Sequence, residues 1–369
     1  MVADVAIVGA GIVGLAVGCE LGRRGASVTI LDARGVGLGA TQASAGMLVP
    51  YIEGLGDTPM LSLAAASLAM YDEFVDRVAR DSCVSVAYRR TGSLEVATDD
   101  ESAERLTAAA ARLASAAVPC TFLTGRQARD AEPHLAPDVV AGMLLPAHGF
   151  VVANDLSSAL SAAATKHGVR IRVPARVRRI AAGDDVTTIE LDNDRVTARE
   201  VVIAAGSWSG QLDVPGMPSL PVRPVRGQLI QLAWSGTPLA RVTWGARCYL
   251  VPIGGDTLLV GATVEEAGFD ERATVAGVHD LLDAACDLVP QVWQATFSGV
   301  RVGLRPGTPD GLPIIGRSRT HPGVIYATGH FRNGVLLAPL TARLVADLIL
   351  EHREDPLLAL TSPQRFGVF

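Results

Sequence analysis

Lysine is almost absent from this sequence of 369 residues: Lys166 is the only one, although lysine and arginine together number 32. It lies in the stretch AAATKHGVRI, which is typical of the exposed end of a helix before a strand. A mechanism that forms a Schiff base on a lysine amine, as pyridoxal-dependent enzymes do, therefore has one poor candidate.

Cysteine is also scarce, and no two cysteines are spaced as C-x-x-C. The five cysteines are Cys19, Cys83, Cys120, Cys248 and Cys286. Such spacing predicts neither a disulfide framework nor a zinc site. We therefore expect no metal, and free thiols are compatible with a reducing cytoplasm.

Basic charge is not concentrated anywhere in the chain. The net charge is −6, and no block of basic residues with interleaved aromatics indicates a nucleic-acid groove. The N-terminal run VADVAIVGAGIVGLAVGCELG is apolar enough to imitate a signal peptide, but it has no basic leader and it carries Asp4. We expect a small-molecule partner, no nucleic acid, and no targeting or membrane segment.

Hydrophobic residues make up 49% of the chain, enough for two cores. Residues 4–9, DVAIVG, are predicted to form a buried strand, residues 12–24 a helix, and the run ASVTILD a second strand. This order is a βαβ unit, which is typical of a doubly wound parallel sheet.

The first turn of this unit carries Gly9, Gly11 and Gly14 in G-x-G-x-x-G spacing. The first glycine allows a tight turn, the second lets the backbone approach a pyrophosphate, and the third lets helix and strand pack closely. Asp32 ends the second strand, where a carboxylate can accept hydrogen bonds from ribose hydroxyls. The unit predicts an adenine dinucleotide, but it does not choose between NAD and FAD.

Further segments favour FAD. Residues 34–50, RGVGLGATQASAGMLVP, are small enough to let backbone run along an extended ligand. Residues 199–210, REVVIAAGSWSG, are predicted to be a strand that ends in small residues. Residues 323–339, GVIYATGHFRNGVLLAP, are predicted to be a strand, a glycine turn and the start of a helix, whose amides could hold an anionic group.

Together these segments resemble the FAD-dependent amine and amino-acid oxidoreductases of the D-amino-acid oxidase family. The stretches CYLVP, GLRPGTPDGLPIIG and GHFRNGVLLAP are most similar to those of the glycine oxidases of thiamine biosynthesis. The glycine triplet is shared by many flavoproteins, whereas the arginine stretch and GHFRNG are more specific. The resemblance covers nearly the whole chain.

The resemblance implies an α/β fold with a discontinuous, Rossmann-like FAD-binding domain and an α+β substrate domain built on a mostly antiparallel sheet. We assign residues 1–84, 145–212 and 301–369 to the first domain, and residues 85–144 and 213–300 to the second.

The remaining patterns are compatible with this division. Residues 58–81, 100–117 and 272–288 are predicted to be helices, and LSSALSAAATKHGVRIRV a helix followed by a strand. The runs RGQLIQLAW, ARCYLVPI and DTLLVGATV are predicted to be strands of the antiparallel sheet.

Arg305 lies in residues 303–316, GLRPGTPDGLPIIG, among glycines and prolines that predict a loop. The resemblance implies that Arg305 holds the substrate carboxylate, a task that suits the guanidinium fork. It also implies that Tyr249 adds a hydroxyl contact to the same carboxylate and that Arg332 lies near the substrate. His330 is a candidate base, but hydride transfer from a neutral amine needs none, so we expect it to be a structural neighbour of the flavin.

The resemblance likewise implies which residues bind the FAD, without a covalent bond. They are Gly9, Gly11, Gly14, Asp32, Ala33, Thr41, Gln42, Ala45, Gly46, Met47, Val177, Ala205, Gly206, Trp208, His330, Arg332, Asn333 and Gly334.

Two residues depart from the pattern of glycine oxidases. Arg247 stands where a histidine would be typical, and Val264 stands where a methionine would be. If both face the pocket, Val264 leaves more room and Arg247 could favour an acidic side chain.

We therefore expect an FAD-dependent oxidase that converts glycine, sarcosine or small D-amino acids to an imine and reduces O₂ to H₂O₂. The resemblance implies a role in thiazole synthesis, a cytoplasmic location, and a homo-oligomer such as a tetramer. A D-amino-acid dehydrogenase that uses a quinone or carrier, a non-catalytic FAD-binding subunit of a larger complex, and an NAD-linked dehydrogenase remain alternatives.

Overall fold

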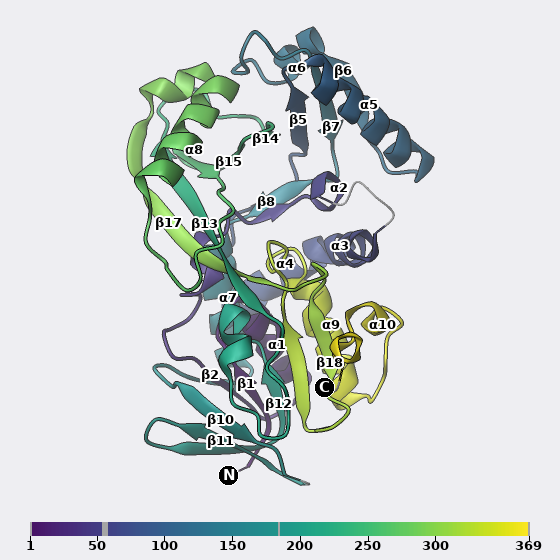
Figure 1. The fold of residues 1–369 in the computed structure, drawn as a ribbon, viewed down its shortest axis with the longest axis vertical. Helices are drawn as coiled ribbons and strands as arrows, with labels where there is room; N and C mark the ends of the chain where they lie inside the picture. The colour runs from purple at the N-terminus through teal and green to yellow at the C-terminus, as the bar shows by residue number, and fades with distance from the viewer. Residues whose placement is uncertain (1, 54–57, 184, 368–369) are drawn as a thin grey trace.

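The computed structural model of the chain describes residues 2–53, 58–183 and 185–367. Within these residues the strands form two eight-stranded sheets and one three-stranded sheet. The first large sheet occupies the lower half of Figure 1 and the second the upper half, and two long strands, β13 and β17, connect the halves.

The first sheet is parallel at its centre, in the order β9-β2-β1-β12-β19. These strands are β9 (Arg170–Arg172), β2 (Val28–Leu31), β1 (Ala3–Val8), β12 (Arg195–Ile203) and β19 (Val324–Thr328). The C-terminal part of β12 pairs with β19, whereas its N-terminal part pairs antiparallel with β11 (Thr187–Leu191). The antiparallel strands β10 (Val177–Ala181) and β18 (Ile314–Arg317) extend the sheet from β11 and β19.

Three helices share one apolar core beside this sheet: α1 (Ile12–Arg23), α7 (Ala153–Lys166) and α9 (Ala338–Leu350). Helix α1 contacts both of the others. Its sequence IVGLAVGCELGR is apolar on almost every side, which suits a helix that is covered by a sheet and two helices.

The second sheet has the order β17-β13-β16-β15-β14-β5-β7-β6, and every pairing except that of β14 with β5 is antiparallel. Its strands are β17 (Thr296–Gly307), β13 (Arg223–Ala233), β16 (Thr257–Gly261), β15 (Tyr249–Gly254), β14 (Val242–Trp244), β5 (Ser93–Ala97), β7 (Ala141–Leu145) and β6 (Thr121–Thr124). Helix α8 (Val275–Leu288) packs on β13 and β16, and α5 (Asp100–Ser115) packs on β5 and β7.

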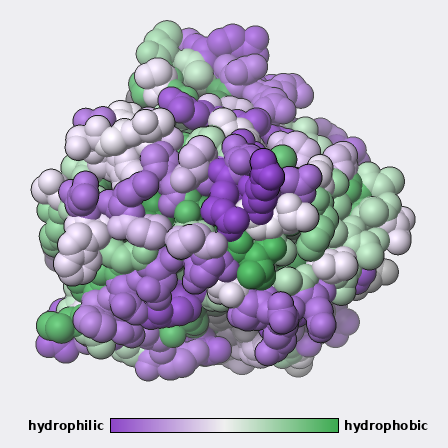
Figure 2. Space-filling model, turned by 90° about the horizontal axis from the view of Figure 1, so that it is seen from above, coloured by the Kyte–Doolittle hydropathy of each residue, from purple (hydrophilic) through white to green (hydrophobic). Residues whose placement is uncertain are grey.

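The small sheet lies between the two large ones in Figure 1. Its strands are β3 (Met47–Leu48), β8 (Gly149–Val151) and β4 (Tyr88–Arg89). On the face seen from above in Figure 2, hydrophobic residues occur in small groups between hydrophilic ones, as is usual for a protein surface.

The topology confirms the predicted fold class. One predicted helix differs: residues 58–81 form α3 (Pro59–Ala69) and α4 (Tyr71–Ser82), with Met70 between them. No glycine or proline marks this break in the sequence. Beyond it, the buried hydroxyl of Tyr71 donates a hydrogen bond to the carbonyl of Val335 at 2.8 Å.

The domain boundary predicted at residues 300/301 falls inside β17, which pairs with β13 from Thr296 to Gly307. This strand therefore belongs to the second sheet for its whole length, and its C-terminal end leads toward β18. The division of the chain into domains stays a prediction.

Candidate functional site

A cavity of about 870 Å³ lies between the two large sheets. Its wall includes the glycine turn after β1, Asp32 after β2, and the segments that follow β12 and β19. The second sheet contributes residues of β13, β15, β16 and β17. The C-terminal ends of parallel strands are where ligands bind in open α/β sheets, so the cavity is in the expected place.

The three glycines of the first turn differ in what a side chain would meet. Gly9 has φ +115°, and a Cβ there would lie 2.3 Å from the carbonyl oxygen of Ala204. A Cβ on Gly14 would lie 2.0 Å from the carbonyl oxygen of Gly9, so Gly14 allows close packing and does not line the cavity. Gly11 lines the cavity, and the nearest atom to its Cβ position is Thr41 Oγ1 at 3.6 Å.

The carboxylate of Asp32 ties two turns together. Oδ2 accepts a hydrogen bond from Ala10 N at 2.8 Å, and Oδ1 accepts from Arg34 N and Gly35 N at 2.7 and 2.9 Å. A carboxylate offers about four acceptor positions, so one remains for a ligand hydroxyl.

The segment after Asp32 folds against the start of α1. The 3₁₀ helix η1 (Ala40–Ala43) places Thr41 Oγ1 3.1 Å from Ile12 N, which donates to it. Gly46 has φ +69°, and a Cβ there would lie 1.7 Å from the carbonyl oxygen of Val151. Backbone therefore runs along the cavity at a point where a larger residue has no room.

The cavity wall includes every residue predicted to bind the cofactor except Gly14 and Gln42. Gln42 instead donates a backbone hydrogen bond to Gly37 O at 3.1 Å. Arg305, Tyr249 and Arg332, predicted to lie near the substrate, also line it. The structure thus brings segments from the whole chain together, while the role of each residue stays a prediction.

Sequence reasoning missed a contact across the nucleotide side of the cavity. Arg34 Nη1 donates to Glu271 Oε1 at 2.9 Å and to Oε2 at 3.0 Å, and the guanidinium carbon of Arg34 lies 5.3 Å from the Trp208 ring centroid. The Phe269 ring lies 5.7 Å from the same tryptophan. No local signal in the sequence could reveal these pairs, because their members are far apart along the chain.

His330 is buried, with 2% of its surface exposed. Its Nε2 lies 3.0 Å from Thr341 Oγ1. Burial lowers the pKa of His330 to about 3, so the imidazole is neutral near pH 7 and is a very weak base. These properties support the structural role that we expect for it.

The turn after His330 is fixed to β17. Phe331 has φ +49°, and its backbone N–H donates to Pro306 O at 2.9 Å. The guanidinium carbon of Arg332 lies 4.9 Å from the Phe331 ring centroid. The predicted helix after this turn starts only at Ala338, so the turn itself, rather than a helix N-terminus, lines the cavity.

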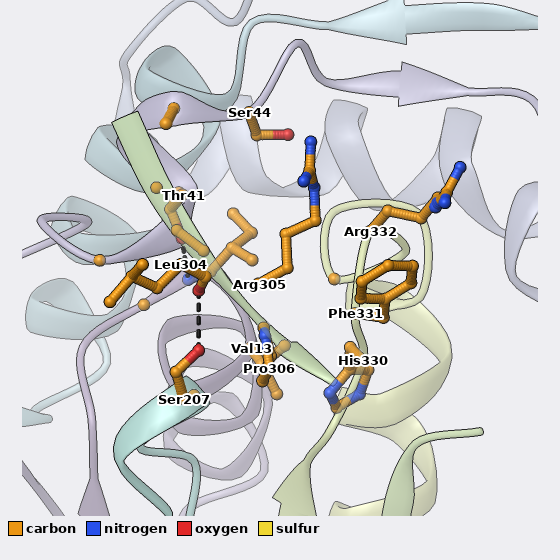
Figure 3. A pocket seen from close by; sticks show the side chains of 18 of the residues that line it. Val13, Thr41, Ser44, Ser207, Leu304, Arg305, Pro306, His330, Phe331 and Arg332 are labelled. Atoms are coloured by element: carbon orange, nitrogen blue, oxygen red, sulfur yellow. Dashed lines mark hydrogen bonds between the residues drawn. The ribbon is translucent and has the colours of Figure 1, made fainter. Parts of the chain in front are cut away.

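The prediction that Arg305 lies in a loop is wrong, because β17 extends through Gly307. Glycine and proline normally interrupt strands, but β17 is the edge strand of its sheet, where a proline is tolerated. Arg305 is partly buried, and its Nη1 donates to Thr263 O at 2.9 Å and to Arg226 O at 3.3 Å. In Figure 3 the Arg305 side chain extends from β17 in the direction of the segment that carries Ser44.

Tyr249 begins β15, and its ring lies 5.1 Å from that of Trp244. Ser207 Oγ donates to the Leu304 carbonyl at 2.8 Å, which fastens β17 to the segment after β12 (Figure 3). This hydrogen bond anchors the second sheet beside the segment after β12, and Arg305 and Tyr249 belong to the part of the cavity wall that the second sheet contributes.

The two unusual residues behave differently in the structure. Val264 lines the cavity and is 59% exposed, while the extra room that it leaves stays a prediction. Arg247 also lines it, but its guanidinium pairs with Asp283 at 2.7 Å and Asp287 at 2.8 Å, both on α8. Two carboxylates of the protein therefore already pair with the guanidinium that could favour an acidic substrate side chain.

Cys248 lines the cavity, and burial raises the pKa of its thiol to about 12, so it is protonated near pH 7. Among the residues that the structure describes, no three histidine, cysteine, aspartate or glutamate side chains are grouped as metal ligands. Within the same part of the chain, no helix has both the length and the apolar composition of a membrane span.

The chain matches the family model described as FAD dependent oxidoreductase over residues 4–348. Glycine oxidase of Geobacillus kaustophilus is 36% identical, over 95% of this chain and 93% of that protein. The bifunctional protein ThiO/ThiG of Nostoc sp. is 35% identical over 97% of this chain and 54% of that protein, so the chain spans about half of it. The crystal structure of glycine oxidase from Geobacillus kaustophilus superposes with a TM-score of 0.94 and 35% identity, over 98% of each chain.

Proposed function

Because the chain belongs to the family of FAD-dependent oxidoreductases, we propose that it oxidises glycine, or a small amine such as sarcosine, at the C–N bond. The products are an imine and, from O₂, H₂O₂; water then converts the imine of glycine to glyoxylate and ammonia. One observation carries this proposal: the partly buried Arg305 lines the same cavity as the nucleotide segments. The glycine oxidases among its relatives support the same substrate.

The cavity fits FAD. Gly11 leaves space beside the N-terminus of α1, where backbone amides favour a pyrophosphate, and Asp32 retains an acceptor position for a ribose hydroxyl. Residues of the turn from His330 to Gly334 would hold the other end of the molecule. When bound, FAD supplies the acceptor of the hydride and returns the electrons to O₂.

The chain itself binds and orients the amino acid. The Arg305 guanidinium is held by two backbone carbonyls, so its planar fork faces a carboxylate without further ordering. The Tyr249 hydroxyl is a second donor for the same carboxylate. Two donors at one end of a small substrate fix the direction in which its α-carbon points.

Proton transfer by the protein is not required if the amine binds in its neutral form. His330 is neutral and buried, and its Nε2 lies within hydrogen-bond distance of Thr341 Oγ1. The residues around the reacting carbon thus position the substrate and exclude water.

Several finer statements are part of the same proposal. Non-covalent binding of FAD is favoured because Cys248, the cysteine in the cavity wall, is a protonated thiol. A role in thiazole synthesis, a homo-oligomeric state and a cytoplasmic location come from the resemblance to glycine oxidases of thiamine biosynthesis.

The visible spectrum of the purified protein tests the proposal. We expect a yellow flavin band that glycine bleaches in the absence of air, and that recovers with formation of H₂O₂ when air is admitted. A band that glycine bleaches but that recovers only with a quinone or dye would indicate a dehydrogenase. A yellow protein that no small amine bleaches would contradict the proposed reaction.

A further inference from the structure

We infer that Gly227 and Gly261 are positioning residues for the substrate carboxylate. Each leaves a hollow in the sheet, and each hollow holds one of the two side chains that we propose as hydrogen-bond donors to that carboxylate. The Arg305 side chain occupies the hollow at Gly227, and the Tyr249 ring occupies the hollow at Gly261. This inference rests on the proposed function for the identity of the ligand, a small carboxylate. The hollows themselves are features of the sheet.

The strand register places these residues on one face of the sheet. Val225 is opposite Arg305, so Gly227 is the diagonal neighbour of Arg305. Gly261 is directly opposite Tyr249. Side chains alternate between faces along a strand, and directly opposite or diagonal neighbours on the same face are the ones that touch.

The hollow at Gly227 is filled by the guanidinium. A Cβ built on Gly227 would lie 2.3 Å from Arg305 Nη2 and 2.4 Å from both its Cζ and Nη1. Even alanine therefore cannot be accommodated unless the guanidinium moves away.

The hollow at Gly261 is filled by the phenol. A Cβ there would lie 2.4 Å from the Tyr249 hydroxyl oxygen and 2.5 Å from the ring carbon that carries it. An added methyl group would displace the hydroxyl, which is the atom proposed to contact the carboxylate.

A left-handed backbone does not explain these glycines. Neither has φ in the positive range that favours glycine, unlike Gly9 or Gly46. Glycine inside a strand is destabilising relative to alanine. Space for the side chain of the neighbouring strand is the property that glycine supplies at both positions.

An ion pair between the buried Arg226 and the partly exposed Glu265 fixes the carbonyl of Arg226 beside the first hollow. Arg226, whose side chain is 8% exposed, pairs with Glu265 at 2.5 Å, and the two residues also exchange backbone hydrogen bonds at 2.9 and 3.0 Å. The Arg226 carbonyl and that of Thr263 accept from Arg305. The guanidinium thus lies over Gly227 and donates to carbonyls of two adjacent segments, which sets the direction of its fork.

The test compares Gly227→Ala and Gly261→Ala with Gly142→Ala in the FAD-loaded protein. Gly142 is a mid-strand glycine of β7 in the same sheet, it lies outside the cavity wall, and a Cβ there would lie 3.1 Å from Ala128 Cβ. The readouts are the Kd of glycolate, an unreactive carboxylate, by calorimetry, together with KM and kcat for glycine, flavin absorbance and Tm.

We expect Gly227→Ala to raise the Kd of glycolate and the KM of glycine at least tenfold, with kcat changed less than threefold. Gly261→Ala should raise both about fivefold, and Gly142→Ala less than twofold. Because Gly227→Ala acts through Arg305, it should change the Kd of glycolate and the KM of glycine less than twofold in a protein that already carries Arg305→Ala. A purely structural loss would instead lower Tm and flavin content in both backgrounds.

A glycolate Kd within twofold of the parent value in folded Gly227→Ala would overturn the inference. If that variant does not fold, Gly261→Ala decides. In a protein that already carries Tyr249→Phe, Gly261→Ala should not raise the Kd of glycolate further. A rise as large as in the parent protein would contradict a role of Gly261 in positioning Tyr249. If glycine fails to bleach the flavin of the parent protein, the proposed function fails, while glycolate binding to the same variants still tests the two hollows.

Discussion

Replacing Arg305 with alanine removes the guanidinium that two carbonyls hold in the cavity wall. Loss of a charge-assisted, bidentate contact with a carboxylate costs about 2 to 4 kcal/mol. This corresponds to a fall in kcat/KM of about 30-fold to 1,000-fold. Partial burial of Arg305 limits screening by solvent, so we expect a value in the upper half of this range.

Arg305→Lys separates charge from shape. Lysine keeps the positive charge but cannot present two parallel donors, so we expect a fall in kcat/KM of about 5-fold to 30-fold. Arg301→Ala is the matched control: Arg301 lies on the same strand, donates to Gln231 Oε1 at 2.6 Å, and is outside the cavity wall.

Steady-state oxygen uptake with glycine measures all three variants, and flavin absorbance verifies that each one retains its cofactor. KM should account for most of the change. An Arg305→Ala protein with kcat/KM within threefold of the parent would refute the carboxylate role and return Arg305 to a structural one.

The structure supports further predictions. Burial raises the pKa of Glu95 from 4.5 to about 7, so the folded state loses stability as the pH rises between these values, by up to about 3 kcal/mol in total. Glu95→Gln should therefore raise Tm at pH 8 but not at pH 4.5, whereas Glu104→Gln, at an exposed position, should change Tm at neither pH. Equal shifts in the Tm of Glu95→Gln at both pH values would contradict the raised pKa. Arg247→Ala should change the preference for glycine over D-aspartate less than threefold, because α8 already pairs with this guanidinium; a tenfold loss on D-aspartate alone would show that Arg247 contacts the substrate. Gly9→Ala should lower flavin content at least tenfold, since its Cβ would lie 2.3 Å from a carbonyl oxygen; a fully yellow variant would show that the turn can adjust.

The N-terminal unit was predictable because its signals are local. Glycine spacing, strand composition and Asp32 lie within a short stretch, and the structure places strand, helix and strand within a few residues of the predicted bounds. The strand that carries Arg305 was not predictable in this way. Glycine and proline indicate a loop when read locally, and only the position of β17 at the sheet edge makes them compatible with a strand.

The part of the cavity wall that the second sheet contributes depends on strand register, which local sequence does not reveal. Gly227 and Gly261 lie inside predicted strands, where an isolated glycine is a signal of close approach by another group. That signal identifies the positions but not the neighbours. The pairing of Tyr249 with Gly261, and of Arg34 with Glu271, requires the folded chain.

The arrangement of β12 has a consequence for the order of events during synthesis. Its N-terminal part pairs with β11, which is close in sequence, but its C-terminal part must wait for β19, and α1 must wait for α9. Until those residues leave the ribosome, a parallel strand edge and an apolar helix surface stay uncovered, which is when a nascent chain is most exposed to aggregation and most dependent on chaperones. The turn after His330 emerges in the same late interval, so the cavity wall that includes this turn is completed only after β19 has been synthesised.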